Sequence, residues 1–136
     1  MVKMSVLYEG ELHCRLTHGP SKSEIVTDAP VDNMGKGQAF SPTDLVGAAL
    51  GSCILTVMGI VAQRHNINMT DAKAEVSKEM VTTPVRRIGS LTVDIQMPQG
   101  IDPAKREMLE RAGHTCPVHK SLRDDVKVSV QFHYPD

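Results

Sequence analysis

The stretch that decides the fold runs from Ser41 to Ala62 and reads SPTDLVGAALGSCILTVMGIVA. Ser41 can cap a helix, Pro42 suits the first helical position, and Asp44, three residues after the cap, completes a capping box. From Leu45 to Ala62 the chain has 18 residues without a charge. A helix that is apolar on nearly every face is expected to be buried all round.

The same run reaches the lower length limit of a membrane-spanning helix. It is rich in glycine and alanine, however, and no aromatic belt flanks it. We therefore predict the core helix of a soluble protein. Gly47 and Gly51 are four residues apart. This spacing suggests that the helix packs closely against a partner helix, such as its own copy in a dimer.

Shorter elements surround this helix and set the fold class. Alternating apolar residues predict three strands before it and a hairpin after it, followed by two helices and a last strand. These elements are expected at residues 5–8, 12–17 and 24–27, then 72–80 and 91–97, 102–113 and 116–122, and 126–132. The order indicates an α+β fold in a single domain of residues 1–136, with a mostly antiparallel sheet.

The composition excludes some classes of function. Lys plus Arg number 15 and Asp plus Glu 16, and the basic residues are scattered. A nucleic-acid binder usually shows a clustered basic excess, so we expect no nucleic-acid partner. Three cysteines without a scaffold spacing and no leader pattern favour a reducing cytoplasm and no membrane. The scarcity of aromatic residues, with two Tyr, two Phe and no Trp, favours a core completed by dimerisation.

The three cysteines differ in their setting. Cys53 lies in the middle of the predicted core helix, where a single cysteine is most often a small buried residue. Cys116 precedes Pro117 at the start of a predicted helix. Unpaired N–H groups at that position would stabilise a thiolate. Cys14 lies in a predicted strand and is read as structural.

Two separated blocks carry a resemblance to a known family. The block from Phe40 to Cys53, followed far downstream by Cys116-Pro-Val118, resembles the OsmC/Ohr family of osmotically inducible and organic hydroperoxide resistance proteins. The sequence around His18-Gly-Pro-Ser21 and Gly35-Lys-Gly37 is similar to one branch of this family. The resemblance covers almost the whole chain. It implies the OsmC-like fold around a long buried central helix, in an intertwined homodimer.

The resemblance also implies a thiol peroxidase that needs no cofactor. Cys53 would be oxidised to a sulfenic acid by an organic hydroperoxide and Cys116 would resolve it as a disulfide, which a dithiol reduces. Family members activate the first cysteine with an arginine held by a carboxylate. The candidate side chains here are Arg15, Arg86, Arg87 and, for the carboxylate, Asp44.

The chain departs from the family pattern at two places. Thr43 stands ten residues before Cys53, where the hydroperoxide-resistance branch has Glu. Asp44 is nine residues before Cys53, on roughly the opposite face of a straight helix, which favours capping over holding an arginine. After Cys116-Pro-Val the chain continues with His119-Lys-Ser121, without the usual Asn.

Other readings of the same residues stay open. His114, Cys116 and His119, joined by Cys53, offer zinc ligands, although no standard spacing is present. A Cys–His hydrolase has no recognisable oxyanion-hole motif. A non-enzymatic member of the family could bind an apolar ligand or sense redox state through the same cysteines.

Overall fold

The computed structural model describes residues 1–135, which form two compact units, Met1–Val46 and the chain from Gly47 onward. The first unit is built on three strands, β1 (Met4–Gly10), β2 (His13–His18) and β3 (Glu24–Asp28). They pair antiparallel in the order β1-β2-β3, which we call sheet A. A 3-10 turn, η1 (Val31–Asn33), follows within the long loop before the first helix.

Helix α1 (Pro42–Arg64) begins in the first unit and continues in the second. Its start confirms the capping box. The Ser41 hydroxyl accepts a hydrogen bond from the Asp44 N–H at 3.0 Å, and the Asp44 carboxylate accepts one from the Ser41 N–H at 3.0 Å. Two of the unpaired N–H groups of the helix start are satisfied in this way.

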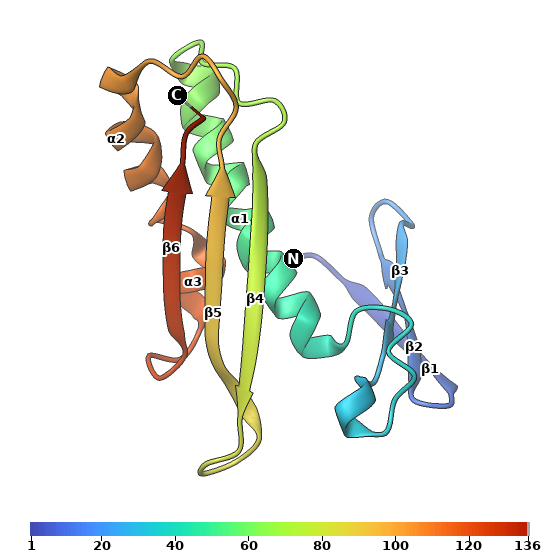
Figure 1. Cartoon of the computed structure of the whole chain (residues 1–136). Helices are drawn as coiled ribbons and strands as arrows, with labels where there is room; N and C mark the ends of the chain where they lie inside the picture. The colour runs from blue at the N-terminus through green and yellow to red at the C-terminus, as the bar shows by residue number, and fades with distance from the viewer. Residues whose placement is uncertain (136) are drawn as a thin grey trace. The chain divides into compact units, whose positions relative to one another are not determined.

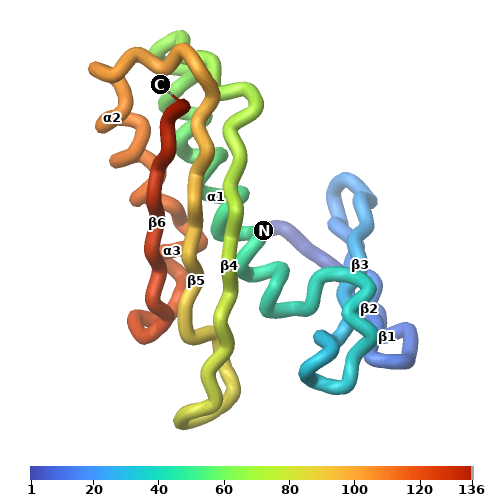
Figure 2. The backbone as a smooth tube through the Cα atoms, in the orientation of Figure 1, coloured from blue at the N-terminus to red at the C-terminus, as the bar shows by residue number. Residues whose placement is uncertain are grey.

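The second unit contains sheet B, which has the strand order β4-β5-β6. Its elements are β4 (Lys73–Val81), β5 (Arg87–Gln96), α2 (Pro103–Gly113), α3 (Pro117–Ser121) and β6 (Lys127–His133). Strands β4 and β5 form the expected antiparallel hairpin, whereas β5 and β6 are parallel. Parallel strands need a crossover, and α2 with α3 supplies it. Both views place the helices on one side of sheet B (Figures 1 and 2).

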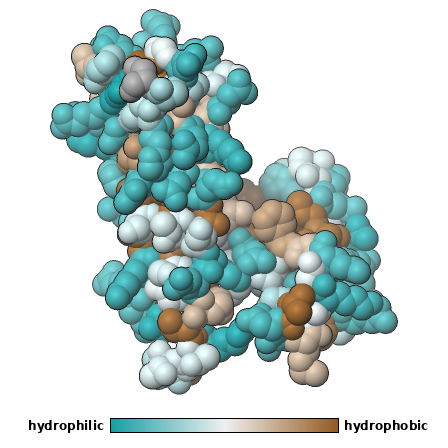
Figure 3. Space-filling model, viewed as in Figure 1, coloured by the Kyte–Doolittle hydropathy of each residue, from teal (hydrophilic) through white to brown (hydrophobic). Residues whose placement is uncertain are grey.

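The core of the second unit lies between α1 and sheet B. Residues four apart on one face of α1, among them Leu50, Ile54 and Met58, are fully buried. They pack in one cluster with Leu91 and Val93 of β5. Successive residues of a strand face opposite sides, so the other face of sheet B carries mostly hydrophilic side chains (Figure 3).

The expectation that α1 is buried all round is wrong for the single chain. Only one face of the helix is covered, and Ala49, Ser52, Thr56 and Ile60 are exposed. The reason is that the described helices and strands of one chain cover α1 from one side. By length and composition α1 could also cross a membrane, but the core helix of a soluble protein meets the same criterion.

Gly47 and Gly51 face sheet B, so the close approach that these two glycines permit is to the strands and not to a partner helix. A Cβ atom on Gly47 would lie 3.3 Å from a methyl group of Leu91, and one on Gly51 would lie 2.9 Å from Cγ2 of Val76. Side chains at these positions would push the helix off the strands. Glycine therefore sets the distance between α1 and β4.

Substitution of Gly51 tests this contact. We expect Gly51→Val to lower the free energy of unfolding by about 1–3 kcal/mol, because a branched side chain overpacks the interface with Val76 and Ala74. Urea unfolding followed by circular dichroism would measure the loss. Ser77→Val is the matched control, since Ser77 lies next to Val76 on β4 but is exposed. It should change stability by less than about 0.5 kcal/mol. Equal effects of both variants would contradict the assignment.

The C-terminal residues hold α2 in place. The Tyr134 hydroxyl donates a hydrogen bond to the Glu110 carboxylate at 2.8 Å, and the Arg106 guanidinium lies 4.2 Å from the centre of the Tyr134 ring. Burial, together with the neighbouring Glu110 carboxylate, raises the pKa of Tyr134. Tyr134 thus stays a hydrogen-bond donor, and α2 is tied to the chain that follows β6.

Candidate functional site

The second unit brings Cys53 and Cys116 together. Cys53 is partly exposed near the middle of α1, whereas Cys116 is completely buried at the N-cap of α3. Both belong to one packed cluster, and Cys53 is close enough to raise the pKa of Cys116. Both are free thiols in this structure, as is Cys14. Two cysteines that are 63 residues apart in the sequence (116 − 53) therefore form one neighbouring pair.

The pKa of Cys116 is raised, contrary to the expectation of a stabilised thiolate at a helix start. Burial is the main cause, and the neighbouring Cys53 thiol acts in the same direction. The backbone N–H groups of His119 and Val118 lower the pKa but do not outweigh burial. The His119 N–H lies 3.4 Å from the Cys116 Sγ. In a low-dielectric setting the neutral thiol is favoured.

The chain between α2 and α3 positions Cys116. Helix α2 ends at Gly113, where an added Cβ atom would lie 3.3 Å from Ile54 and from Met58 of α1. The Thr115 N–H and hydroxyl both donate to the Ala112 carbonyl, at 3.0 and 2.7 Å. This tight turn brings Cys116 back to α1 beside Cys53.

Arg87 is held by the turn before β6. Its Nη1 donates to the Asp125 carbonyl at 3.2 Å and lies 3.8 Å from the Asp125 carboxylate, which Arg123 also approaches at 3.2 Å. Its Nε is buried without a hydrogen-bond partner. The guanidinium therefore anchors the segment that follows α3.

Arg15 belongs to the first unit, and the cysteine pair to the second. The Arg15 Nε donates to the Glu9 carboxylate at 3.0 Å, and Nη1 lies 3.6 Å from Glu24. The hydrogen bond and charge of Glu9 raise the pKa of Arg15. An arginine held by carboxylates is thus present. The carboxylates that hold it belong to Glu9 and Glu24 of sheet A, whereas the candidate Asp44 caps α1.

A histidine–aspartate pair beside Arg15 was not anticipated from the sequence. Asp28 is 7% exposed and accepts hydrogen bonds from the His13 Nδ1 at 2.6 Å and from the Gln38 N–H at 3.1 Å. The other ring nitrogen of His13 lies 3.4 Å from the Glu9 carboxylate. His13 and Asp28 are direct partners in the β2–β3 register, a pairing that a correct strand alignment could have revealed.

The pair makes stability depend on pH in a defined direction. The hydrogen bond from His13 lowers the pKa of Asp28. A lowered folded-state pKa means that the stabilisation is present above the ordinary pKa of about 3.9 and is lost as pH falls toward the lowered value. We expect Asp28→Asn to reduce the thermal midpoint at pH 7.

The difference between wild type and Asp28→Asn should shrink as the pH falls below about 4, where unfolded aspartate is protonated. Melts at pH 7 and pH 3 would measure it. Asp124→Asn, which removes an exposed acid from the turn before β6, is the control and should show no such pH-dependent difference. A deficit of Asp28→Asn that persists unchanged at pH 3 would contradict an ionised Asp28.

The residues considered for zinc do not form a ligand cluster. Among residues 1–135, no group of three or more His, Cys, Asp or Glu side chains is placed to hold a metal ion. The His114 ring instead packs edge-on against Phe132, with 5.9 Å between ring centres.

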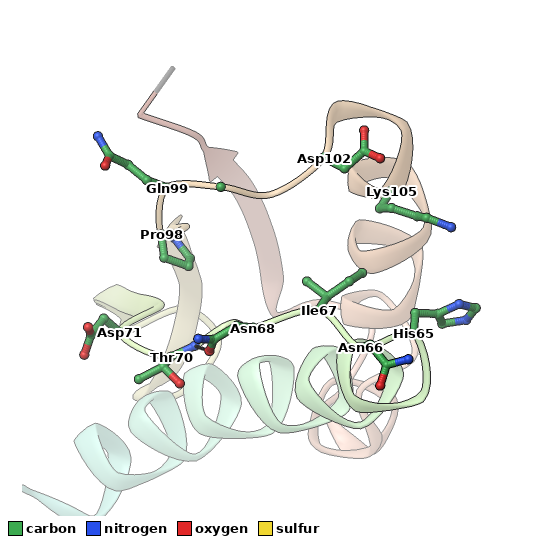
Figure 4. A pocket seen from close by; sticks show the side chains of 11 residues that line it. His65, Asn66, Ile67, Asn68, Thr70, Asp71, Pro98, Gln99, Asp102 and Lys105 are labelled. Carbon is green, nitrogen blue, oxygen red and sulfur yellow. Dashed lines mark hydrogen bonds between the residues drawn. The ribbon is translucent and has the colours of Figure 1, made fainter.

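A polar pocket of about 500 Å³ lies beyond the C-terminal end of α1, between the segment 65–71, the segment 98–102 and α2. Figure 4 shows Asp71 on the opposite side of the pocket from His65 and Lys105, whose side chains point outward on the same side. The charged groups do not converge on a common point. None of the candidate catalytic residues lines this pocket.

Comparison with protein families decides the relationship. The family model of OsmC-like proteins matches residues 35–131. The chain belongs to the OsmC-like family. A crystal structure from Psychrobacter arcticus, of a protein named for osmotic stress induction and detoxification response, is 41% identical with a TM-score of 0.92 and covers 98% of this chain and 96% of its own.

More distant family structures share the fold. An organic hydroperoxide resistance protein OsmC of Legionella pneumophila is 18% identical, with a TM-score of 0.76 and coverage of 97% of this chain and 96% of its own. The organic hydroperoxide resistance protein OhrB of Bacillus subtilis is 20% identical, with a TM-score of 0.68 and coverage of 98% of both chains. A comparison with curated proteins found no match. The α+β fold predicted from the sequence is thereby confirmed.

Proposed function

We propose that this OsmC-like protein is a cysteine-dependent peroxidase that reduces organic hydroperoxides to alcohols. The observation that carries the proposal is the neighbouring pair of a partly exposed Cys53 and a buried Cys116. A reactive thiol must be reached by its substrate, and a resolving thiol must lie next to it. Family neighbours named for organic hydroperoxide resistance support the substrate class.

The reaction divides into three steps. The Cys53 thiolate attacks the hydroperoxide, which leaves a sulfenic acid on Cys53 and releases the alcohol. Cys116 then attacks the Cys53 sulfur, and water is released as the disulfide forms. An external dithiol reduces the disulfide by thiol–disulfide exchange. The apolar side chains of α1 next to Cys53, such as Val57, favour an organic substrate.

Arg15 and Arg87 are the two proposed cations that assist Cys53. Each is already oriented by carboxylates, as a cation that acts at a fixed place requires. Asp44 is a proposed supporting carboxylate in addition to its capping role. We place the enzyme in the cytoplasm, as one domain, with no cofactor.

Peroxide turnover tests the proposal. Wild type with a dithiol should consume cumene hydroperoxide faster than hydrogen peroxide. Cys53→Ser should abolish the reaction, and Cys116→Ser should reduce multiple turnover by about 10²-fold or more, because the sulfenic acid is no longer resolved inside the protein. Loss of peroxide, followed continuously, measures all three.

Cys14→Ser is the matched control, because Cys14 lies in sheet A of the first unit, and it should keep full activity. Turnover of wild type no faster than that of the dithiol alone would overturn the peroxidase. The same thiol pair would then be read as a redox sensor.

We propose a homodimer that covers the exposed apolar surface of each chain. Ile60 on the uncovered face of α1 is 46% exposed. In sheet A, Met4, Val6, Leu16 and Ile25 line an apolar hollow of about 420 Å³. Apolar surface of this kind is typical of an interaction site.

Sedimentation would test the homodimer. We expect a species of twice the 14.8 kDa chain mass, and Ile60→Glu should shift it toward monomer, because a charge would be buried in the interface. Val85→Glu is the control, since Val85 is also exposed but lies between β4 and β5. A monomeric wild type at micromolar concentration would refute the dimer.

A further inference from the structure

The proposed reaction has a proton requirement that the cysteine pair is placed to meet. When the Cys53 sulfur attacks the terminal oxygen of an alkyl hydroperoxide, the O–O bond breaks and its electron pair leaves on the alkoxide. An alkoxide is strongly basic, so an acid that protonates it in the transition state speeds the step, typically by 10²–10⁴-fold.

The residues of α1 one helical turn from Cys53 do not provide an available proton donor. Ala49 and Val57, one helical turn away on either side, have none. The Thr56 hydroxyl donates to the Ser52 carbonyl at 2.8 Å. From outside α1, the Cys116 thiol packs in the same cluster as Cys53 and lies beside it.

Cys116 has the properties of such an acid. Its side chain is completely buried beside Cys53, and its sulfur accepts the His119 N–H at 3.4 Å. Because burial raises the pKa of Cys116, the thiol keeps its proton at neutral pH. A thiol is nevertheless a far stronger acid than an alcohol, so transfer of the proton to an alkoxide is downhill.

We infer that Cys116 is a catalytic acid that protonates the alkoxide leaving group before it serves as the resolving nucleophile. The inference rests on the proposed peroxidase function. The proton passes from the Cys116 sulfur to the alkoxide oxygen, which yields the alcohol and a Cys116 thiolate. That thiolate attacks the Cys53 sulfenic acid, the S–S bond forms, and hydroxide leaves and takes a proton from solvent. Cys53 and Cys116 together lose the two electrons that reduce the hydroperoxide.

The acid role predicts a dependence on the leaving group. Cys116→Ala removes the donor but leaves Cys53 in place. In a single turnover without reductant, the first oxidation of Cys53 by cumene hydroperoxide should slow by about 10²-fold or more. Peroxybenzoic acid releases benzoate, which needs no proton, so its reaction with Cys116→Ala should stay within about threefold of wild type. Loss of the first equivalent of peroxide measures the rate for both wild type and variant. In the variant, rapid quenching and mass spectrometry should also show the gain of one oxygen atom.

Each outcome separates the acid from a structural role. Slowing with cumene hydroperoxide alone supports the inference. Equal slowing with both peroxides, as a displaced Cys53 would give, overturns it, and so does no slowing with either. If wild type itself fails to react with cumene hydroperoxide, the proposed function falls together with the inference; if wild type reacts and Cys116→Ala matches it, only the acid role falls.

Discussion

The close packing of α2 against α1 at Gly113 is the contact on which the cysteine pair depends. A side chain at Gly113 would begin 3.3 Å from Ile54 and Met58, so glycine lets the two helices approach this far without displacing those side chains. Ile54 directly follows Cys53, and Cys116 comes three residues after Gly113. The absence of a side chain at Gly113 and the short turn through Thr115 therefore determine where Cys116 lies relative to Cys53.

The pair is asymmetric, and the asymmetry gives each thiol its own role. Cys53 is partly exposed, so a substrate can reach it. Cys116 is sealed in the core and holds its proton. A helix N-terminus alone would favour the opposite charge state, but the N–H groups of a five-residue helix do not outweigh complete burial.

The elements could be predicted from the sequence where local chemistry determines them. Ser41 and Asp44 mark the start of α1 because each satisfies an N–H group of the other, and the alternation in β4 and β5 records one covered face. Long-range placement could not be predicted. Nothing local to β6 tells that it pairs parallel to β5, and the glycine stripe of α1 could face a helix or a sheet equally well.

The site could be predicted only in part, because its contacts also depend on long-range placement. The resemblance named both cysteines, but their contact depends on packing at Gly113, which lies outside both motifs and 60 residues after Cys53 (113 − 53). The partners of Arg15 and Arg87 depend on strand register and on the turn at Asp125, which a pattern of single residues does not encode. The raised pKa of Cys116 depends on burial, which is a property of the assembled core.

The proposed reaction needs Cys53 as a thiolate, and the charges of the residues proposed to assist it decide how much each can help. Arg87 is paired with Asp125, and Arg15 lies between Glu9 and Glu24, a group with a formal charge of +1 − 2 = −1. A cation already paired with carboxylates gives a nearby thiolate less stabilisation than an unpaired one. Burial keeps Cys116 neutral, so Cys116 adds no second negative charge beside a Cys53 thiolate.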